Sequence, residues 1–144
     1  MKAGMSIPTV LLLFANATFG QEIKTFKEFH PNGKLLSVKH EGLFNGCTMP
    51  VGTDTMFFVS GKIQATTFYD NRKSKTQAGC HEGWTIETRK TFFENGHLRT
   101  FAQEKYSYEG SPCNCGTWVW MQPDNKVIKR KKYGNCYDQK ACQN

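Results

Sequence analysis

Aromatic and apolar residues recur along the chain in short segments that end at turn signals. Three segments, "FHPNGKLL", "FFVSGKIQ" and "FFENGHLR", place an aromatic residue before a turn glycine and an apolar residue two positions after it. The turn glycines are Gly33, Gly61 and Gly96, and a fourth, degenerate copy, "MQPDNKVI", carries Asn125 in the same position. The steps between these positions are 28, 35 and 29 residues. Internal repetition with a period of about 20 to 50 residues indicates an array in which one supersecondary unit covers the next.

Each copy predicts two strands joined by the turn. The strand before the turn is aromatic-rich, as in "DTMFFV", "WTIETRKTFF" and "TWVWM", a composition typical of strands. The strand after the turn alternates: Ile63, Ala65 and Thr67 fall on one face and Phe68 on the other. The dipeptide Asn95-Gly96 predicts a two-residue hairpin turn in which both residues take positive φ.

No segment combines a 3.6-residue hydrophobic period with helix caps at both ends. We therefore predict an all-β fold, an elongated antiparallel sheet of about four stacked β-hairpin repeats stapled by disulfides. Between the hairpins, the glycine-containing segments "HEGLFNGC", "DNRKSKTQAGC" and "YEGSPCNCG" are interpreted as return loops.

The first twenty residues differ from the rest of the chain. They contain Lys2, an apolar run from Val10 to Phe14, and small residues that precede a predicted cut before Gln21. This pattern predicts a secretory signal peptide over residues 1–20 and a single repeat domain with a short Cys-containing tail over residues 21–144. The alternative is a buried N-terminal helix. We expect a secreted, periplasmic or cell-envelope protein, with no transmembrane segment because no later stretch approaches about 18 apolar residues.

The chain contains an even number of cysteines, all after the predicted leader: Cys47, Cys80, Cys113, Cys115, Cys136 and Cys142. In an exported protein this pattern predicts disulfides. Their positions relative to the return loops place them along one edge of the sheet. The favoured pairing joins Cys47 with Cys80, and Cys113 or Cys115 with Cys136 or Cys142. The alternative is a four-thiolate zinc site in the last four cysteines, which their Cys-x-Cys spacing does not favour.

The charge of the chain is basic. Nineteen Lys and Arg against 12 Asp and Glu give +7, and removal of Lys2 with the leader lowers this to +6. Such a charge favours acidic partners in general. The sequence names neither a partner nor an oligomeric state, and it indicates no cofactor.

The densest basic segment is "KVIKRKKYGN". Because strand side chains alternate, Lys129 and Lys131 should face one side of the sheet, and Arg130 and Lys132 the other. One interpretation is a strand that binds an anionic surface, and the other is an edge strand whose lysines discourage pairing with other chains. In the preceding strand, Trp118 and Trp120 share a face and form either an aromatic platform or part of the core. These residues are the candidate binding site: Trp118, Trp120, Lys129, Arg130, Lys131 and Lys132.

Catalytic chemistry has weak support in the sequence. The histidines are His30, His40, His81 and His97, and a small secreted ribonuclease would use two of them as acid and base. His30 and His97, however, occupy or adjoin the predicted turns. The acidic residues are dispersed among turns and strands, at Glu82, Glu87, Glu94, Glu104 and Glu109. No serine-hydrolase, phosphate-loop or zinc-protease motif is present, so we predict no catalytic residues and no metal site.

The repeated hairpin, followed by a glycine-containing loop and an aromatic strand in "GWTIETRKTFFENGHLRTFAQEKYSYEG", resembles the MORN-repeat variants, including bacterial proteins labelled YwqK-family antitoxin-like. The resemblance covers about residues 24–135. It implies a single elongated sheet of stacked hairpins with no catalytic residue set. The units here are longer than standard MORN units and poorer in paired Gly and Tyr, so the lipid-binding role of some MORN proteins is not transferred to particular residues. An exported chain also does not suit the neutralisation of a cytosolic toxin.

The sequence therefore predicts an exported, non-enzymatic β-repeat protein that binds a protein or an anionic surface. One alternative is a small, basic, secreted hydrolase of the ribonuclease type. The other is an envelope-associated protein that binds anionic lipid or glycan. Nucleic acid is not favoured as a partner.

Overall fold

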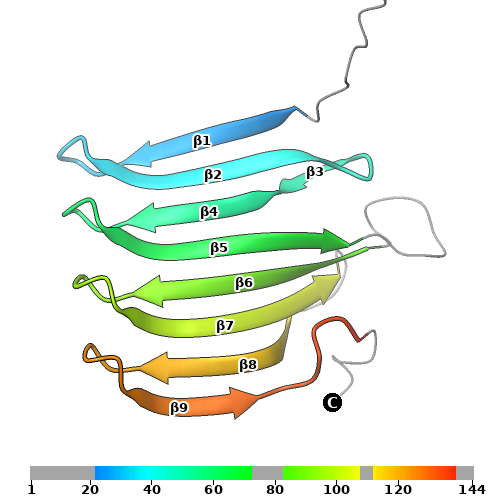
Figure 1. The fold of residues 1–144 in the computed structure, drawn as a ribbon. Coiled ribbons are helices and arrows are strands. Elements are labelled where there is room, and N and C mark those ends of the chain that lie inside the picture. The colour runs from blue at the N-terminus through cyan, green and yellow to red at the C-terminus, as the bar shows by residue number, and fades with distance from the viewer. Residues whose placement is uncertain (1–21, 73–82, 108–111, 139–144) are drawn as a thin grey trace, which may run out of the picture.

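A computed structural model of the protein describes residues 22–72, 83–107 and 112–138, and the predicted leader over residues 1–20 lies outside them. Figure 1 shows one open antiparallel sheet of nine strands, with the order β1-β2-β4-β5-β6-β7-β8-β9 and with β3 paired to β2. The strands are β1 (Ile23–Phe29), β2 (Leu35–Phe44), β3 (Cys47–Pro50), β4 (Gly52–Phe57), β5 (Ile63–Arg72), β6 (Trp84–Phe92), β7 (Leu98–Ser107), β8 (Cys113–Met121) and β9 (Val127–Lys132). The described residues contain no helix. The predicted all-β antiparallel fold is confirmed.

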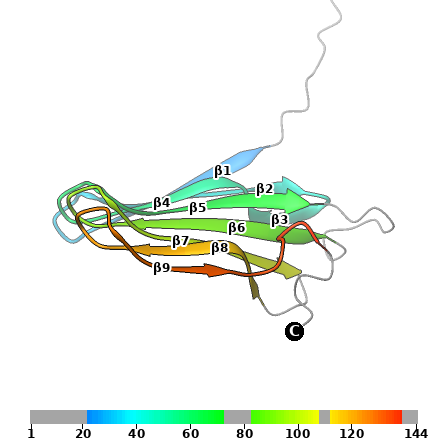
Figure 2. The same ribbon diagram turned by 60° about the horizontal axis from the view of Figure 1, so that its bottom comes forward.

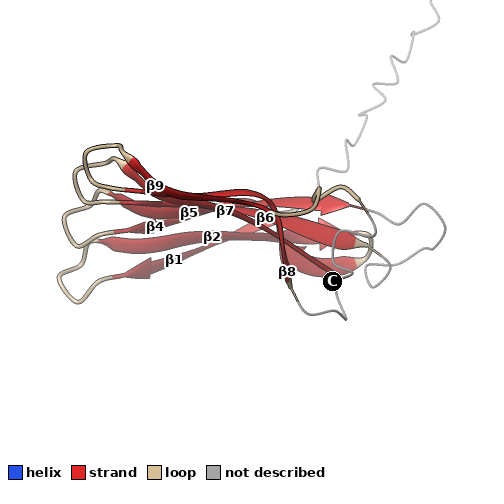
Figure 3. Cartoon of the chain, turned by 90° about the horizontal axis from the view of Figure 1, so that it is seen from below, coloured by secondary structure: helices blue, strands red, loops and turns tan. Residues whose placement is uncertain are grey.

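The strands lie in one twisted layer. Figures 2 and 3 show the sheet obliquely and from below, and no second sheet or helix of the described residues packs on it. A single layer encloses little apolar surface, and among the described residues the buried hydrophobic side chains are Ile86, Cys115 and Cys136. Strands β1 and β9, at the two edges, are exposed along their whole length. The sheet therefore presents most of its surface to solvent, and stabilisation depends heavily on its backbone ladders and disulfides.

The turn at Asn95-Gly96 differs from the prediction. Phe93 N donates to His97 O at 2.9 Å and Gly96 N donates to Phe93 O at 2.8 Å. Of the loop residues, only Gly96 has positive φ, at 87°. These bonds define a three-residue loop, a type I turn followed by a left-handed residue. The predicted two-residue turn is wrong, because the type I turn holds Asn95 at negative φ.

All four repeat turns share this geometry, and they lie at the same end of the strands, at the left of Figure 1. Their left-handed residues have φ values of 79° (Gly33), 90° (Gly61), 87° (Gly96) and 67° (Asn125). Pro31 and Pro123 occupy the first central position of their type I turns, where the φ of proline fits. These prolines were a sequence signal against a turn that requires positive φ at that position. The predicted hairpin positions are correct, and only the turn type is wrong.

The register shifts by one residue after each repeat turn. In the first hairpin, Glu28 pairs with Ser37 but Phe29 pairs with Leu35, which leaves Leu36 as the extra residue. The equivalent extra residues in the other hairpins are Gln64, Arg99 and Ile128. Such bulges bend a strand and increase its twist. Their repetition at one end of every hairpin is consistent with the common bend of the strands in Figure 1.

The two-residue turn is found at a different Asn-Gly dipeptide. Asn45 and Gly46 both have positive φ, at 52° and 89°, and Phe44 pairs with Cys47 across the turn. The segment "HEGLFNGC", interpreted as a return loop, is therefore the end of β2, a tight turn and the start of β3. Close to the break between β3 and β4, Asp54 Oδ1 accepts a hydrogen bond from the backbone N–H of His40 at 2.8 Å. This bond takes the place of a backbone hydrogen bond between the strands.

The two faces of the sheet are named here by one residue each. The Trp118 face carries Trp118 and Trp120, together with Glu87 and Glu104 from β6 and β7. The Ile86 face carries Ile86, Lys105 and Cys115, and the segment after β9 folds back near it (Figure 2). There Cys136 joins the buried cluster of Ile86 and Cys115, against which Trp84 packs. Lys105 Nζ donates to Asp138 O at 2.7 Å and lies 5.0 Å from the centre of the Trp84 ring.

The disulfide prediction is confirmed for one bridge, Cys115–Cys136, whose Cα atoms are 5.0 Å apart. This bridge excludes the four-thiolate zinc site. Cys47 and Cys113 are also disulfide-bonded, while Cys80 and Cys142 lie outside the described residues, so the pairing of Cys47 with Cys80 stays a prediction. The return-loop assignment is wrong for Cys47, Cys113 and Cys115, which lie in β3 and β8. The strands extend further than the glycines suggested, because pairing with a neighbouring strand continues through them.

Candidate functional site

The candidate binding residues lie on the last two strands of the sheet. Trp118 pairs with Lys131 and Trp120 with Lys129 across β8 and β9, so these four side chains share the Trp118 face. Arg130 and Lys132 alternate with them and lie on the Ile86 face. The predicted division of the basic residues between the two faces is confirmed. We call Trp118, Trp120, Lys129, Lys131 and Tyr133 the aromatic–basic strip.

Ring contacts connect the strip. The Trp118 ring centre lies 5.8 Å from that of Trp120 and 5.4 Å from that of Tyr133. Lys129 Nζ lies 5.4 Å from the Trp120 ring centre and Lys131 Nζ 4.6 Å from the Tyr133 ring centre, within the range of cation–π attraction. The three rings are half-buried and the lysines are exposed. The tryptophans thus form a shared surface platform rather than a fully buried core.

A backbone irregularity holds Trp118 in place. The register of β7 and β8 shifts between Phe101 and Gln103, and Trp118 Nε1 donates to Gln103 O at 2.8 Å. The indole therefore bonds to a backbone group beside the irregularity. This bond fixes the ring orientation before any partner arrives.

The basic residues of β9 form no ion pair with the described acidic residues. No ion pair among the described residues includes Lys129, Arg130, Lys131 or Lys132. Strand β9 is an edge strand, as the sequence predicts. The edge-protecting interpretation and the binding interpretation therefore apply to the same strand, and they are compatible because the lysines of the strip face one side.

Two hollows extend the strip toward the middle of the Trp118 face. One, of about 160 Å³, is lined by Glu87, Arg89, Ala102, Glu104 and Trp118. The other, of about 430 Å³, has Arg89 in its lining, with the small residues Ala65, Thr67, Thr91 and Thr100. Small side chains on β5, β6 and β7 thus leave a shallow depression, and Arg89 lines both of its parts.

The structure brings together two acidic residues that the sequence left dispersed. Glu87 and Glu104 pair directly across β6 and β7 and line the same hollow. Burial raises the pKa of Glu87, to whose Oε1 the Tyr106 hydroxyl donates at 3.3 Å. Burial also raises the pKa of Tyr106 to about 12. No sequence pattern indicated this pair, because it depends on the register of strands joined by a bulged turn.

With its pKa raised by burial, Glu87 holds its proton to higher pH than an exposed carboxyl does. Nearby, the Tyr69 hydroxyl donates to Asp54 Oδ2 at 3.1 Å, and burial raises the pKa of Tyr69. Glu87 and Asp54 therefore each accept a hydrogen bond from a tyrosine hydroxyl. Within the part of the chain that the structure describes, no group of three or more His, Cys, Asp or Glu side chains is placed to hold a metal ion.

The described histidines contact backbone carbonyls. His30 Nε2 lies 3.1 Å from Phe57 O, and His97 Nδ1 contacts Pro123 O, so each connects its own turn to the neighbouring hairpin. His40 Nδ1 lies 3.0 Å from Thr53 O. These contacts support a structural interpretation of the three residues. His81 lies outside the described residues.

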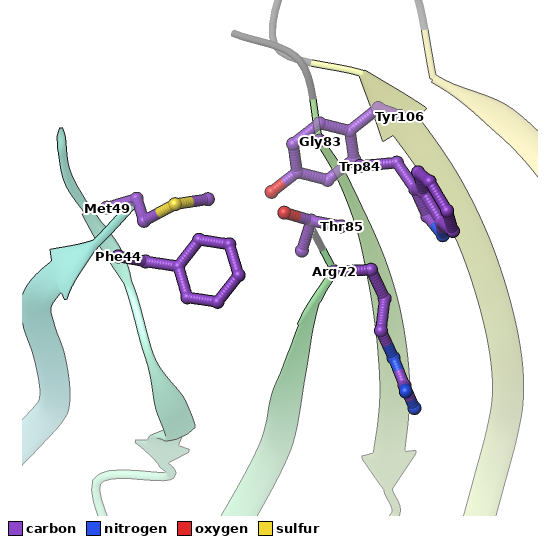
Figure 4. Close-up of a pocket in the computed structure, with 7 residues that line it drawn as sticks. All are labelled: Phe44, Met49, Arg72, Gly83, Trp84, Thr85 and Tyr106. Atoms are coloured by element: carbon purple, nitrogen blue, oxygen red, sulfur yellow. The ribbon is translucent and has the colours of Figure 1, made fainter. Parts of the chain in front are cut away.

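A small gap, drawn in Figure 4, lies beside the β2–β3 hairpin, at the opposite end of the strands from the repeat turns in Figure 1. Phe44 and Met49 of the β2–β3 hairpin point toward Thr85 and Tyr106, and the gap between them measures about 20 Å³. A space of this size holds about one water molecule. It marks where the hairpin packs beside β6 and β7, and it is too small for an organic ligand.

Comparison of the chain with protein-family models, with curated proteins and with solved structures finds no match. The described residues include no helix of the length and apolar character that crossing a membrane requires. The fold and the bridges define the class of protein as an open, single-layer β-hairpin protein with disulfides. The features that bear on its function lie on the surface of the sheet.

Proposed function

We propose that the chain is an exported, non-enzymatic binding protein that takes an anionic partner on its Trp118 face. The observation that carries this proposal is the aromatic–basic strip, in which Lys129 and Lys131 are exposed, form no ion pair with a described residue and are aligned beside two tryptophans. Lysines present ammonium groups to an anion, while flat rings offer contact area at low entropic cost.

The shape of the face supports an extended partner. The hollows that Arg89 lines continue from Trp118 across β7, β6 and β5, and Glu87 and Glu104 also line the smaller one. A bound molecule would then contact several strands and place its anionic groups at the lysines and Arg89. Binding energy would then come from many shallow contacts. This arrangement suits a polymer or a protein surface better than a small metabolite, which needs a concave site that encloses it.

Export and family membership belong to the same proposal. The bridge Cys115–Cys136 and the bonded Cys47 and Cys113 suit an oxidising compartment, which supports the predicted leader over residues 1–20. The four hairpins with one turn geometry support a relationship to the MORN-repeat variants.

Strand β9 offers a matched test with immobilised heparin as the anionic probe. The variants Lys129→Gln/Lys131→Gln and Arg130→Gln/Lys132→Gln remove the same charge from the same strand but from opposite faces. We expect the first pair to elute at clearly lower salt than the second, and Trp120→Ala to weaken retention without a change in net charge. Since exposed charge pairs are screened by salt, retention of the parent should fall as salt rises. Equal elution of the two pairs would show that net charge, not the strip, causes retention.

The enzyme alternative has its own test. RNA is incubated with the purified parent and with a variant in which all four histidines are replaced. We expect no cleavage by either protein. Cleavage by the parent that is lost in the variant would overturn the non-enzymatic assignment and leave the heparin result to be explained as substrate binding.

A further inference from the structure

Strand β1 is an open edge of the sheet, and it exposes apolar side chains. It pairs with β2 on one side, and among the described residues no strand pairs with its other side. Ile23, Phe26 and Phe29 are exposed by 55%, 45% and 59%. Exposed edge strands with apolar residues are templates for pairing with another strand.

The sequence of β1, "IKTFKEF", is complementary to itself when read in the antiparallel direction. Centring the pairing on Phe26 places Phe26 opposite its own copy, Lys24 opposite Glu28, and Ile23 opposite Phe29. Opposite charges and apolar pairs at facing positions each stabilise an antiparallel ladder. We propose that β1 is a docking surface for a second copy of this chain, which forms a two-fold dimer with one continuous sheet.

Two-fold symmetry restricts the register. Antiparallel strands joined edge to edge by a two-fold axis must place one residue opposite itself, because facing residues share a face of the sheet. With Phe26 on the axis, all seven residues of β1 are paired. Moving the axis to Thr25 places Glu22 opposite Glu28, and moving it to Lys27 places Lys27 opposite itself. Both neighbouring registers oppose like charges, so the Phe26 register is favoured.

The acidic partner in this pairing is already oriented. Glu28 Oε2 accepts the Ser37 hydroxyl at 2.6 Å and Oε1 lies 3.2 Å from Lys39 Nζ. These bonds hold the carboxylate on the face that Lys24 and Phe26 share. A carboxylate accepts several hydrogen bonds, so Lys24 of a second copy can join this group.

The other edge of the sheet does not allow the same pairing. Strand β9 carries four consecutive basic residues, from Lys129 to Lys132. A two-fold axis at Lys129 would place that lysine opposite its own copy. An axis at Arg130 would place Arg130 opposite its own copy and Lys129 opposite Lys131. Since like charges at facing positions are destabilising, assembly should stop at the dimer. The axis is perpendicular to the sheet, so the aromatic–basic strips of the two copies lie on the same side, at the two far edges.

The proposal is tested by sedimentation velocity of the purified protein without ligand. The seven-residue ladder is a small interface, and we expect a monomer–dimer equilibrium at about 10 to 500 µM. Thr25 faces Lys27 of the second copy, so Thr25→Glu adds two attractive pairs and Thr25→Lys adds two repulsive ones. We expect Thr25→Glu to dimerise about tenfold more tightly than Thr25→Lys. The two variants differ by two attractive and two repulsive pairs, each worth a few tenths of a kcal/mol, and together these amount to about 1.4 kcal/mol, which is a tenfold change in the dissociation constant. Lys34→Glu, a charge change in the adjacent turn, should leave the equilibrium of the parent unaltered.

A cysteine trap tests the register independently. Phe26→Cys places two thiols opposite each other across the axis, where facing Cα atoms are about 4.5 to 5.5 Å apart and within disulfide range. Oxidation should give a covalent dimer linked through position 26, whereas Lys34→Cys should not cross-link above background. A parent that remains monomeric at the highest concentration overturns the proposal. So does equal dimerisation of the two Thr25 variants, or equal cross-linking of the two cysteine variants. None of these results depends on the heparin experiment, because β1 and β9 are at opposite edges.

Discussion

Removal of the bridge between Cys115 and Cys136 should destabilise the protein strongly. The two cysteines are separated by 21 residues in the sequence. In the chain-entropy description, a loop of this length constrains the unfolded chain by about 3 kcal/mol at 25 °C. The bridge also attaches the segment whose Asp138 carbonyl accepts the Lys105 ammonium. A loss of about 3 kcal/mol is a large part of the stability of a small domain.

The experiment uses the double variant Cys115→Ala/Cys136→Ala, so that no unpaired thiol remains to exchange with the other disulfides. Guanidinium unfolding is followed by tryptophan fluorescence, since Trp84 packs against this cluster. We expect the free energy of unfolding to fall by about 3 kcal/mol. The denaturant slope should rise, because an unfolded chain without the bridge exposes more surface.

The control is Ile86→Val, which removes one methylene from the same cluster and leaves the bridge intact. Its expected cost is about 1 kcal/mol, with an unchanged slope. If the double variant loses no more than this control and keeps the parent slope, the bridge does not act by restricting the unfolded chain. The entropic argument would then be refuted.

Three further predictions concern the repeat turns, the buried Glu87 carboxyl and the Tyr106 phenol. Gly96→Ala should cost about 1 to 2 kcal/mol in unfolding experiments, since Gly96 has a φ of 87°, whereas Glu94→Ala in the same turn should stay within about 0.5 kcal/mol; equal effects would contradict the turn geometry. Because burial raises the pKa of Glu87 above the usual 4.5, the folded state retains that proton more strongly than the unfolded chain does. Stability should therefore fall as the pH rises from about 4.5 through the folded pKa. Glu87→Gln should remove this part of the pH dependence, and an unchanged slope would count against it. The Tyr106 phenol should ionise at about 12 in an ultraviolet titration, and Tyr106→Phe should abolish that step.

The turns show how far local sequence reasoning reaches. The positions of the four hairpins follow from Gly33, Gly61, Gly96 and Asn125, because a left-handed residue is needed there and few residue types supply it. The turn type does not follow from the dipeptide. Asn-Gly forms a two-residue turn at Asn45 but part of a three-residue turn at Asn95. The difference lies in which flanking residues pair across the ends of the turn, and that depends on the register of the whole hairpin.

The candidate site divides in the same way. The placement of Lys129 and Lys131 on one face and Arg130 on the other was predictable, since alternation is a property of a single strand. The hydrogen bond of Trp118 to the Gln103 carbonyl was not, because it depends on an irregular register between β7 and β8. The pairing of Glu87 with Glu104 was also not predictable, since it combines residues of two strands.

The sequence by itself determined the all-β class, the positions of the repeated hairpins and the faces of β9, because turn chemistry and side-chain alternation act within a few residues. The tertiary structure decided the turn type, the extent of β2 and β3, the Cys115–Cys136 bridge and the hollow that Glu87 and Glu104 share. Those features arise where segments distant in the sequence meet, and their geometry is set by strand register. In a single-layer sheet a one-residue shift in register moves a side chain to the other face, so register decides which residues can act together.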